Sequence, residues 1–167
     1  AWESMDGEPA PWRECDGYVE VEPETDHIRT REPIGDCQLH LEWAAPPAAE
    51  GGIGQERGNS GVFLQERYEV QVLDNYENIT YPDGYCGAIY GQHAPDVNAC
   101  LPPEQWQSFD IVFRGPRFDG EEVTRPARVS VFHNGVLIQD AVEIEGPTSG
   151  GGSPYEPHPH EVPLMLQ

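Results

Sequence analysis

The chain has 167 residues, enough for one domain with its own core, and it lacks the roughly 20-residue apolar stretch that a transmembrane helix needs. Its formal net charge is −21 and all nine basic residues are arginines, which argues against binding to nucleic acids and against insertion into anionic membranes. This acidity suits solubility, adaptation to salt or binding of Ca²⁺, although the sequence has no EF-hand-like run of acids.

The start of the chain and its four cysteines both suggest an exported protein. The sequence begins at Ala1 with neither a methionine nor an apolar leader, as a processed or a trimmed chain would. The even number of cysteines, without a C-x-x-C pair, predicts two disulfides rather than four free, buried thiols. Of the three possible arrangements we favour the local one, Cys15–Cys37 with Cys86–Cys100. We therefore expect a secreted, extracellular or periplasmic location.

Strand signals dominate the chain, and helix signals are nearly absent because Pro or Gly interrupts most long stretches. The predicted strands are residues 38–43, 68–72, 106–113, 128–132 and 136–138. In the first of them, alternation puts Leu39, Leu41 and Trp43 on one face. Asn134-Gly135 separates the last two and is the strongest short-range signal for a hairpin. Several short strands divided by turns predict a β-sandwich or jelly roll.

Three stretches have the composition of loops. Residues 44–58 are rich in Pro, Ala and Gly, and residues 75–87 contain the turn signature Pro82-Asp83-Gly84. Residues 146–163 contain a glycine run and several prolines, so composition alone predicts a linker or a disordered tail there.

A set of short motifs, in order along nearly the whole chain, resembles the 3-keto-disaccharide hydrolase family. The best matches are residues 58–63 and 68–75, and the Gly87-Ala88-Ile89-Tyr90-Gly91-Gln92 motif. The others are residues 94–95, 98–99, 106–107, 109–113, 126–128, 133–136, 146–148, 155, 158 and 163–167. Each fragment alone is weak, whereas the ordered set is specific.

The resemblance implies an all-β fold: a concanavalin-like jelly-roll sandwich of two antiparallel sheets, with residues 1–167 as a single domain. It also implies that residues 146–163 form an ordered long loop. Family members continue past a pair like Leu166-Gln167 into a final strand, which is absent from this sequence. We expect the sheet position of that strand to be filled by a continuation of the chain, by another subunit through strand addition, or by residues 1–12 folding back.

The implied activity is hydrolysis of glycosides whose C3 hydroxyl has been oxidised to a ketone. The ketone acidifies the C2 proton, so a base can remove it, the C1 oxygen can leave by β-elimination, and water can then add. Such a site needs a base near C2, an acid for the leaving oxygen and an electrophile at the ketone. The alternative is a carbohydrate-binding or filament-forming extracellular module without turnover.

The strand at residues 68–72 carries the best polar cluster. Glu69 and Gln71 share a face, and Arg67 has the same parity and could pair with Glu69. Asp74 follows the strand with the opposite parity, so it would share the face of Glu69 and Gln71 only if a β-bulge shifted the alternation. A retaining glycosidase needs two carboxyls about 5–5.5 Å apart, and the amide of Gln71 breaks that pattern. We predict Glu69, Gln71 and Asp74 as catalytic residues and Arg67 as a substrate contact.

Other candidates lie in loops. His93 is a further candidate base or metal ligand, since histidine titrates near neutral pH. Asn59 and Ser60 could bind sugar hydroxyls or cap a strand. Tyr90 and Gln92, in the matching motif, are candidate substrate contacts.

The remaining predictions concern a metal, a glycan and two tryptophans. His158 and His160, two residues apart in a proline-rich segment, could bind a divalent ion such as Ca²⁺ or Zn²⁺. Asn78-Ile79-Thr80 matches the pattern for N-glycosylation. Trp43 and Trp106 are predicted as core residues rather than as sugar-stacking platforms.

Overall fold

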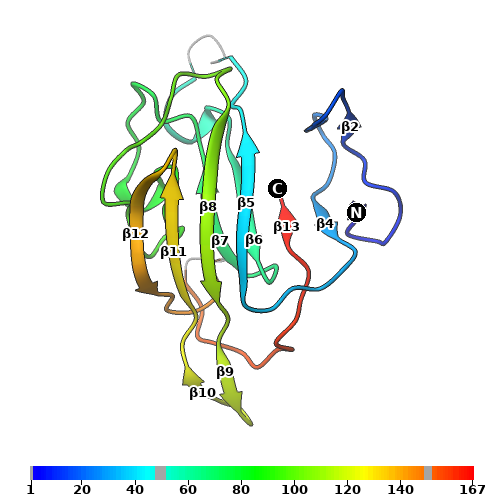
Figure 1. Ribbon diagram of the computed structural model, residues 1–167, viewed down its shortest axis with the longest axis vertical. Coiled ribbons are helices and arrows are strands. Elements are labelled where there is room, and N and C mark those ends of the chain that lie inside the picture. Colours follow the sequence, from blue (N-terminus) through cyan, green and yellow to red (C-terminus); the bar gives the residue numbers. More distant parts are fainter. Residues whose placement is uncertain (1, 48–51, 149–151) are drawn as a thin grey trace.

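The computed structural model describes residues 2–47, 52–148 and 152–167. These residues form two antiparallel sheets and two small hairpins (Figure 1). The all-β sandwich predicted from the sequence is therefore confirmed. In the described ranges the helical segments are two short 3-10 turns, η1 (Gly54–Glu56) and η2 (Pro82–Gly84), and neither could cross a membrane.

Both sheets place strands side by side that are far apart in the sequence. The first sheet has the order β1 (Trp2–Ser4), β4 (Ile28–Thr30), β13 (Met165–Leu166), β6 (Ser60–Leu64) and β7 (Tyr68–Val72). The second has the order β12 (Val136–Glu143), β11 (Arg128–His133), β8 (Gln107–Arg114) and β5 (Cys37–Trp43). The hairpins pair β2 (Arg13–Glu14) with β3 (Val19–Glu20) and β9 (Arg117–Asp119) with β10 (Glu122–Arg125).

Alternating residues from both sheets form the core, as the sequence periodicity predicts. On β8 the buried side chains include Phe109, Ile111 and Phe113, and on β7 they include Val70, while Leu39 of β5 packs against the same cluster. Burial of these apolar side chains is the main stabilising contribution to such a sandwich. The turn between β11 and β12 has positive φ angles at Asn134 and Gly135, as the hairpin signal requires.

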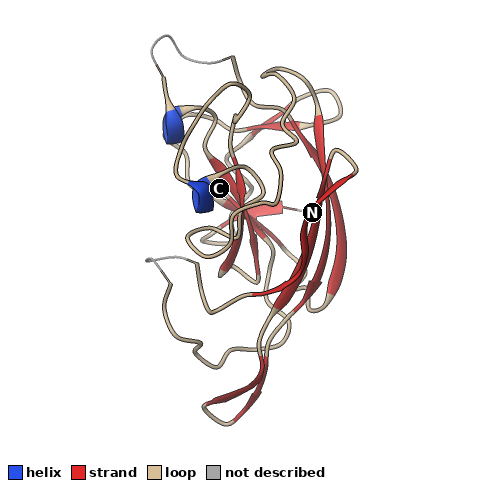
Figure 2. Ribbon diagram, turned by 90° about the vertical axis from the view of Figure 1, so that its left-hand side faces the viewer, coloured by secondary structure: helices blue, strands red, loops and turns tan. Residues whose placement is uncertain are grey.

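The outer face of the first sheet is covered by loops and by both 3-10 turns, which lie on the side of that sheet opposite β8 (Figure 2). On β7, Tyr68, Val70 and Val72 point into the core, so Glu69 and Gln71 point to this outer face. All five residues of the strand are nevertheless buried, because the loops cover that face. The covered outer face of β6 and β7 is where the candidate site lies.

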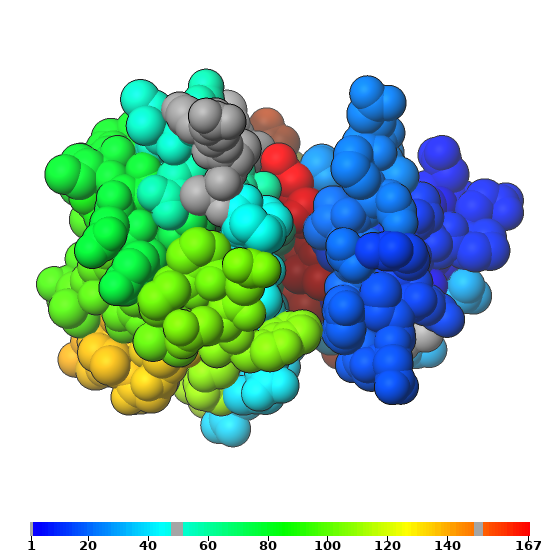
Figure 3. All heavy atoms as spheres, turned by 90° about the horizontal axis from the view of Figure 1, so that it is seen from above, coloured from blue at the N-terminus to red at the C-terminus, as the bar shows by residue number. Residues whose placement is uncertain are grey.

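The two ends of the described chain meet in the first sheet. Strand β13 pairs with β6 on one side and β4 on the other, so the C-terminal segment lies between the N-terminal segment and the rest of the molecule (Figure 3). Strand β1 pairs with β4, while β5 and β12 are the outer strands of the second sheet. Part of the N-terminal segment, residues 2–4, thus folds back as an outer strand of the first sheet. Filling of an edge by another subunit or by further chain stays a prediction.

The predicted disulfides are wrong for the structure, in which all four cysteines are free thiols. Cys15 lies in the β2–β3 hairpin, and its Sγ is 3.6 Å from Glu20 Oε2. Cys37 begins β5, which belongs to a different sheet from that hairpin. Cys86 and Cys100 do come together but are not bonded. The disulfides therefore give no support to export, which stays a prediction.

The two tryptophans predicted as core residues differ in burial. Trp43 is half-buried and packs against the core, with its ring centroid 5.6 Å from that of Phe109. Trp106 is 52% exposed and makes an edge contact with Tyr18, so its assignment to the core is wrong. It lies just before β8 begins and therefore outside the alternation that buries Gln107 and Phe109.

Candidate functional site

The site is centred on Glu69, in the middle of β7. Its side chain lies opposite Phe63 of β6, on the loop-covered outer face, and the residue is only 8% exposed. Burial raises the pKa of the Glu69 carboxyl to about 7, because a carboxylate loses hydration there. Arg67 does not relieve this cost: its guanidinium donates to the carbonyl oxygen of Gln65 at 3.1 Å. Glu69 can therefore exchange a proton near neutral pH.

Gly61 provides the space for this carboxyl. A Cβ atom placed on Gly61 would lie 2.5 Å from Glu69 Oε1 and 2.7 Å from a ring carbon of Phe63. Such distances are too short for any side chain at position 61, so the carboxyl could not keep its position there.

We therefore expect Gly61→Ala to misplace the Glu69 carboxyl and to lower the activity proposed below by up to about a hundredfold. The measurement is kcat/KM together with a melting curve, which checks that the variant is folded. Gly120→Ala is the control for a glycine replaced away from the site: no atom lies within 4 Å of its Cβ, but its φ of 59° strains an alanine, so the variant should melt somewhat lower and keep full kcat/KM. Full activity in Gly61→Ala would mean that the position of the carboxyl is unimportant.

Three amide side chains form a hydrogen-bonded group, and one of them, Gln71, contacts the carboxyl. The Gln71 amide can donate to Gln55 Oε1 at 2.9 Å and to Asn59 Oδ1 at 3.2 Å. With its nitrogen and oxygen exchanged, the same amide donates to Glu69 Oε1 at 2.8 Å and to the Ser60 carbonyl oxygen at 3.0 Å. The second orientation is favoured, because in the first the amide oxygen faces two acceptors, Glu69 Oε1 and the Ser60 carbonyl oxygen. Gln71 thus donates a hydrogen bond to the Glu69 carboxylate.

Two tyrosines from the loop between β7 and β8 adjoin this cluster. The Tyr90 backbone N–H donates to the Glu69 carbonyl oxygen at 3.2 Å, and the Tyr90 and Tyr81 hydroxyls are hydrogen-bonded to each other. Burial, with the Tyr90 hydrogen bond, raises the pKa of Tyr81 to about 12, so Tyr81 stays a neutral donor. Aromatic rings that also carry hydroxyls suit contact with a sugar.

Asp74 has a different set of partners. Its Oδ2 accepts from Arg57 Nε at 2.9 Å, and its Oδ1 accepts from the Tyr76 backbone N–H at 3.0 Å. The ion pair is largely buried, and it joins the end of β7 to the loop before β6. Asp74 therefore has a structural role here, and the geometry gives no support to its predicted catalytic role.

Several other predicted site residues already form hydrogen bonds with backbone groups. His93 Nε2 is 2.9 Å from the Glu143 carbonyl oxygen on β12, and the Gln92 amide binds the backbone of residues 145–146 at both ends. The Ser60 hydroxyl donates to the Gln167 carbonyl oxygen. Of the predicted residues, the structure therefore brings Glu69 together with Gln71, Asn59 and Tyr90.

The two histidines predicted to bind a metal have separate hydrogen-bond partners. His158 Nε2 is 2.8 Å from the Tyr68 hydroxyl, and its Nδ1 is 2.8 Å from the Pro159 carbonyl oxygen. His160 Nδ1 instead contacts Arg117 at 3.1 Å. Each ring already has partners of its own, so the geometry gives no support to the predicted pair.

The predicted glycosylation of Asn78 also conflicts with the structure. The side chain is buried, and its amide nitrogen donates to the carbonyl oxygens of Gly54 and Asp74 at 3.0 and 2.7 Å. Its Oδ1 accepts from the Gly54 N–H at 2.7 Å. A glycan on Nδ2 would replace one of the two N–H donors and would need the buried amide to reach solvent.

Gln55, Tyr81 and Gly61 were missed as site residues by sequence reasoning. Gln55 Nε2 donates to Thr80 Oγ1 at 3.1 Å and to the Gly84 carbonyl oxygen at 2.9 Å, so it ties η1 to η2 beside the carboxyl. The Pro82-Asp83-Gly84 turn was the only signal near Tyr81. A hollow of about 350 Å³ lies near Arg67, but the residues that line it do not include Glu69.

The fold and site together define a concanavalin-like β-sandwich domain with a buried carboxyl among amides and tyrosines. The chain belongs to the family of 3-keto-alpha-glucoside-1,2-lyase-like domains, whose family model matches residues 1–167. No curated protein matches the chain.

Solved structures are similar to the whole chain. A crystal structure of a proposed glycosyl hydrolase from Parabacteroides distasonis ATCC 8503 is 40% identical, with a TM-score of 0.94, over 100% of this chain and 71% of that one. A second proposed glycosyl hydrolase from that organism is 20% identical, with a TM-score of 0.65, over 100% of this chain and 90% of that one. The second similarity concerns the fold alone.

Proposed function

We propose that this domain cleaves 3-keto-glycosides by removing the C2 proton and eliminating the group on C1, with Glu69 as the base. Membership of the lyase-like family and the 40% identical glycosyl hydrolase support a glycoside-processing role. The observation that carries the mechanism is the buried Glu69 carboxyl, whose pKa is raised to about 7. A base with such a pKa is poised for proton transfer at neutral pH.

The surroundings of Glu69 favour one base over a pair of carboxyls. Loss of hydration is what raises its pKa, with no contribution from a charged neighbour. A retaining glycosidase would need a second carboxyl about 5–5.5 Å away, and two carboxyls at that distance would influence each other's titration. The neighbours of the Glu69 carboxyl are instead Gly61 and the Gln71 amide.

The other parts of the reaction fall to neutral donors. The enolate that forms when C2 loses its proton needs hydrogen bonds at the former ketone oxygen. The amide of Asn59 and the hydroxyl of Tyr81 are the candidate donors, since they belong to the polar cluster that includes Gln71 and Tyr90 and stay uncharged near pH 7. The protonated Glu69 can return its proton when water adds to the double bond.

The test compares two substrates that differ only at C3, p-nitrophenyl 3-keto-α-glucoside and p-nitrophenyl α-glucoside. We expect cleavage of the keto sugar and none of the ordinary glucoside, because only the ketone acidifies the C2 proton. In D₂O, elimination followed by hydration places deuterium on C2 of the product, which NMR detects against a control without protein.

Equal cleavage of both sugars would refute elimination, whereas hydrogen retained on C2 would not, because Glu69 can return the proton that it removed. Binding of the keto sugar without cleavage would favour the alternative function, a carbohydrate-binding module.

A further inference from the structure

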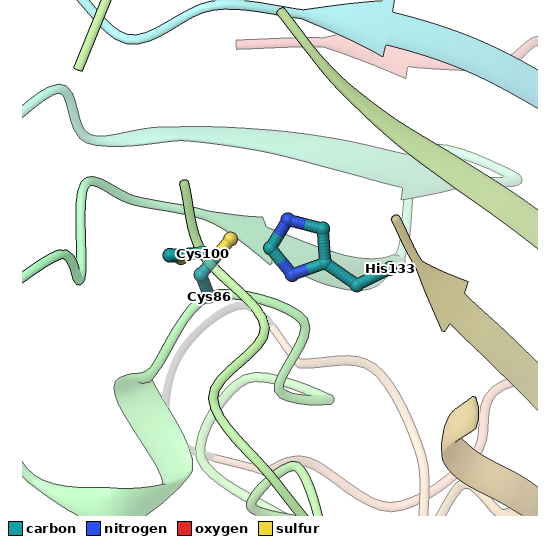
Figure 4. Close-up of side chains that lie close together, drawn as sticks. All are labelled: Cys86, Cys100 and His133. Atoms are coloured by element: carbon teal, nitrogen blue, oxygen red, sulfur yellow. The ribbon is translucent and has the colours of Figure 1, made fainter. Parts of the chain in front are cut away.

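Two thiols and one imidazole lie close together between the sheets, on the core side of β7 rather than on the face of Glu69. Cys86 belongs to the loop after η2, Cys100 to the segment before β8, and His133 is the last residue of β11 (Figure 4). One possible ligand atom from each residue lies within 4.8 Å of the other two. None of these three residues takes part in the proposed reaction.

Hydrogen bonding fixes the tautomer of the imidazole. The Leu101 backbone N–H can only donate, and it contacts Gln107 Oε1 at 2.9 Å, so that atom is the amide oxygen. His133 Nε2 is 2.9 Å from the same oxygen and must therefore carry a hydrogen. The lone pair of the neutral ring is then on Nδ1.

That lone pair has no partner. His133 is fully buried, and its Nδ1 makes no hydrogen bond in the described structure. Buried polar atoms are nearly always satisfied, so an unsatisfied nitrogen on a ring that adjoins two thiols points to a ligand. Figure 4 shows the ring directed toward both cysteine side chains. A histidine that binds a metal through one nitrogen characteristically donates from the other to a protein oxygen, as His133 does to Gln107.

We propose that Cys86, Cys100 and His133 bind one Zn²⁺ ion. Thiolate and imidazole are ligands that Zn²⁺ prefers, whereas Ca²⁺ prefers oxygen. Binding releases the two thiol protons, so that two thiolates balance the charge of the ion and the buried site is neutral. Cu⁺ with the same ligands would leave a net negative charge in the core, which is unfavourable. The Leu73 carbonyl oxygen, 3.7 Å from Cys100 Sγ, is placed near the fourth position.

The ion would hold the long loop between β7 and β8 against the second sheet. Cys86 and Cys100 lie within that loop, which also carries Tyr81 and Tyr90, while His133 lies on β11. The role of the ion would therefore be structural, because it would fix the loop that supplies the two tyrosines of the candidate site.

The test uses the full chain, treated with reductant and chelator and then desalted. We expect it to bind one equivalent of Zn²⁺, measured by elemental analysis, and to melt at a higher temperature with Zn²⁺ than without. Co²⁺ in place of Zn²⁺ should give the intense near-ultraviolet absorption of thiolate-to-cobalt charge transfer.

Cys100→Ser should lose that absorption and the rise in melting temperature. The control is Cys15→Ser/Cys37→Ser, which keeps both cluster cysteines and should behave as the unaltered chain does. The cobalt spectrum of the unaltered protein decides the matter even if Cys100→Ser fails to fold. No stoichiometric Zn²⁺, or a disulfide between Cys86 and Cys100 in protein prepared with Zn²⁺ present, would overturn the proposal.

Discussion

Replacing Glu69 by glutamine is expected to lower kcat/KM for a 3-keto-glucoside by at least about a hundredfold, the usual effect of losing a general base. Glutamine keeps the size of the side chain and removes the group that accepts the C2 proton. Because Gly61 leaves room for a side chain of this size, the fold should not change. The measurement is steady-state cleavage by the unaltered chain and by the variant, with melting curves of both.

The pH dependence shows in which form Glu69 acts. Its pKa of about 7 means that the fraction of ionised carboxylate increases as the pH rises through neutrality. If Glu69 is the base, kcat/KM should rise about tenfold per pH unit below pH 7 and level off above it. If the carboxyl instead acts as the essential acid, the rate should fall over the same range.

Glu42→Gln is the matched control for the substitution. Glu42 lies exposed on β5 of the other sheet, so removal of its charge should leave cleavage unchanged. A Glu69→Gln variant that keeps most of the activity, or a rate that falls as the pH rises through 7, would exclude Glu69 as the base.

The sequence predicted the strands whose side chains alternate cleanly, and it missed others for physical reasons. Strand β8 alternates over its full length and was found to within one residue at either end. Strand β6 was recognised only as a family motif, because four of its five residues are buried and Gly61 interrupts the apolar pattern. Strand β13 has two residues and depends entirely on its neighbours, β4 and β6.

The candidate site was likewise predicted only in part. Strand periodicity put Glu69 and Gln71 on one face, and the structure has them there. Gln55 and Tyr81 could not be found in this way, since they come from loops whose positions depend on contacts far along the chain. The proximity of Cys86 to Cys100 was predicted, but that of His133 was not, because it arises from the pairing of β11 with β8.

Asp74→Ala is expected to lower the free energy of unfolding by roughly 3–5 kcal/mol, because it leaves the Arg57 guanidinium charged and unpaired in a largely buried position. The side chains of Arg57 and Asp74 are only 15% and 2% exposed. The loss is large beside the roughly 5–15 kcal/mol by which domains are usually stable. Urea unfolding of the variant and the unaltered chain measures it.

Two controls separate the ion pair from other effects. Asp140→Ala removes an exposed carboxylate and should change stability by less than about 0.5 kcal/mol. Arg57→Met/Asp74→Leu removes both charges and should recover much of the loss, because neither charge is then left unpaired. A cost below about 1 kcal/mol for Asp74→Ala would mean that solvent reaches the pair. Loss of cleavage without loss of stability would instead return Asp74 to the catalytic role that its sequence position suggested.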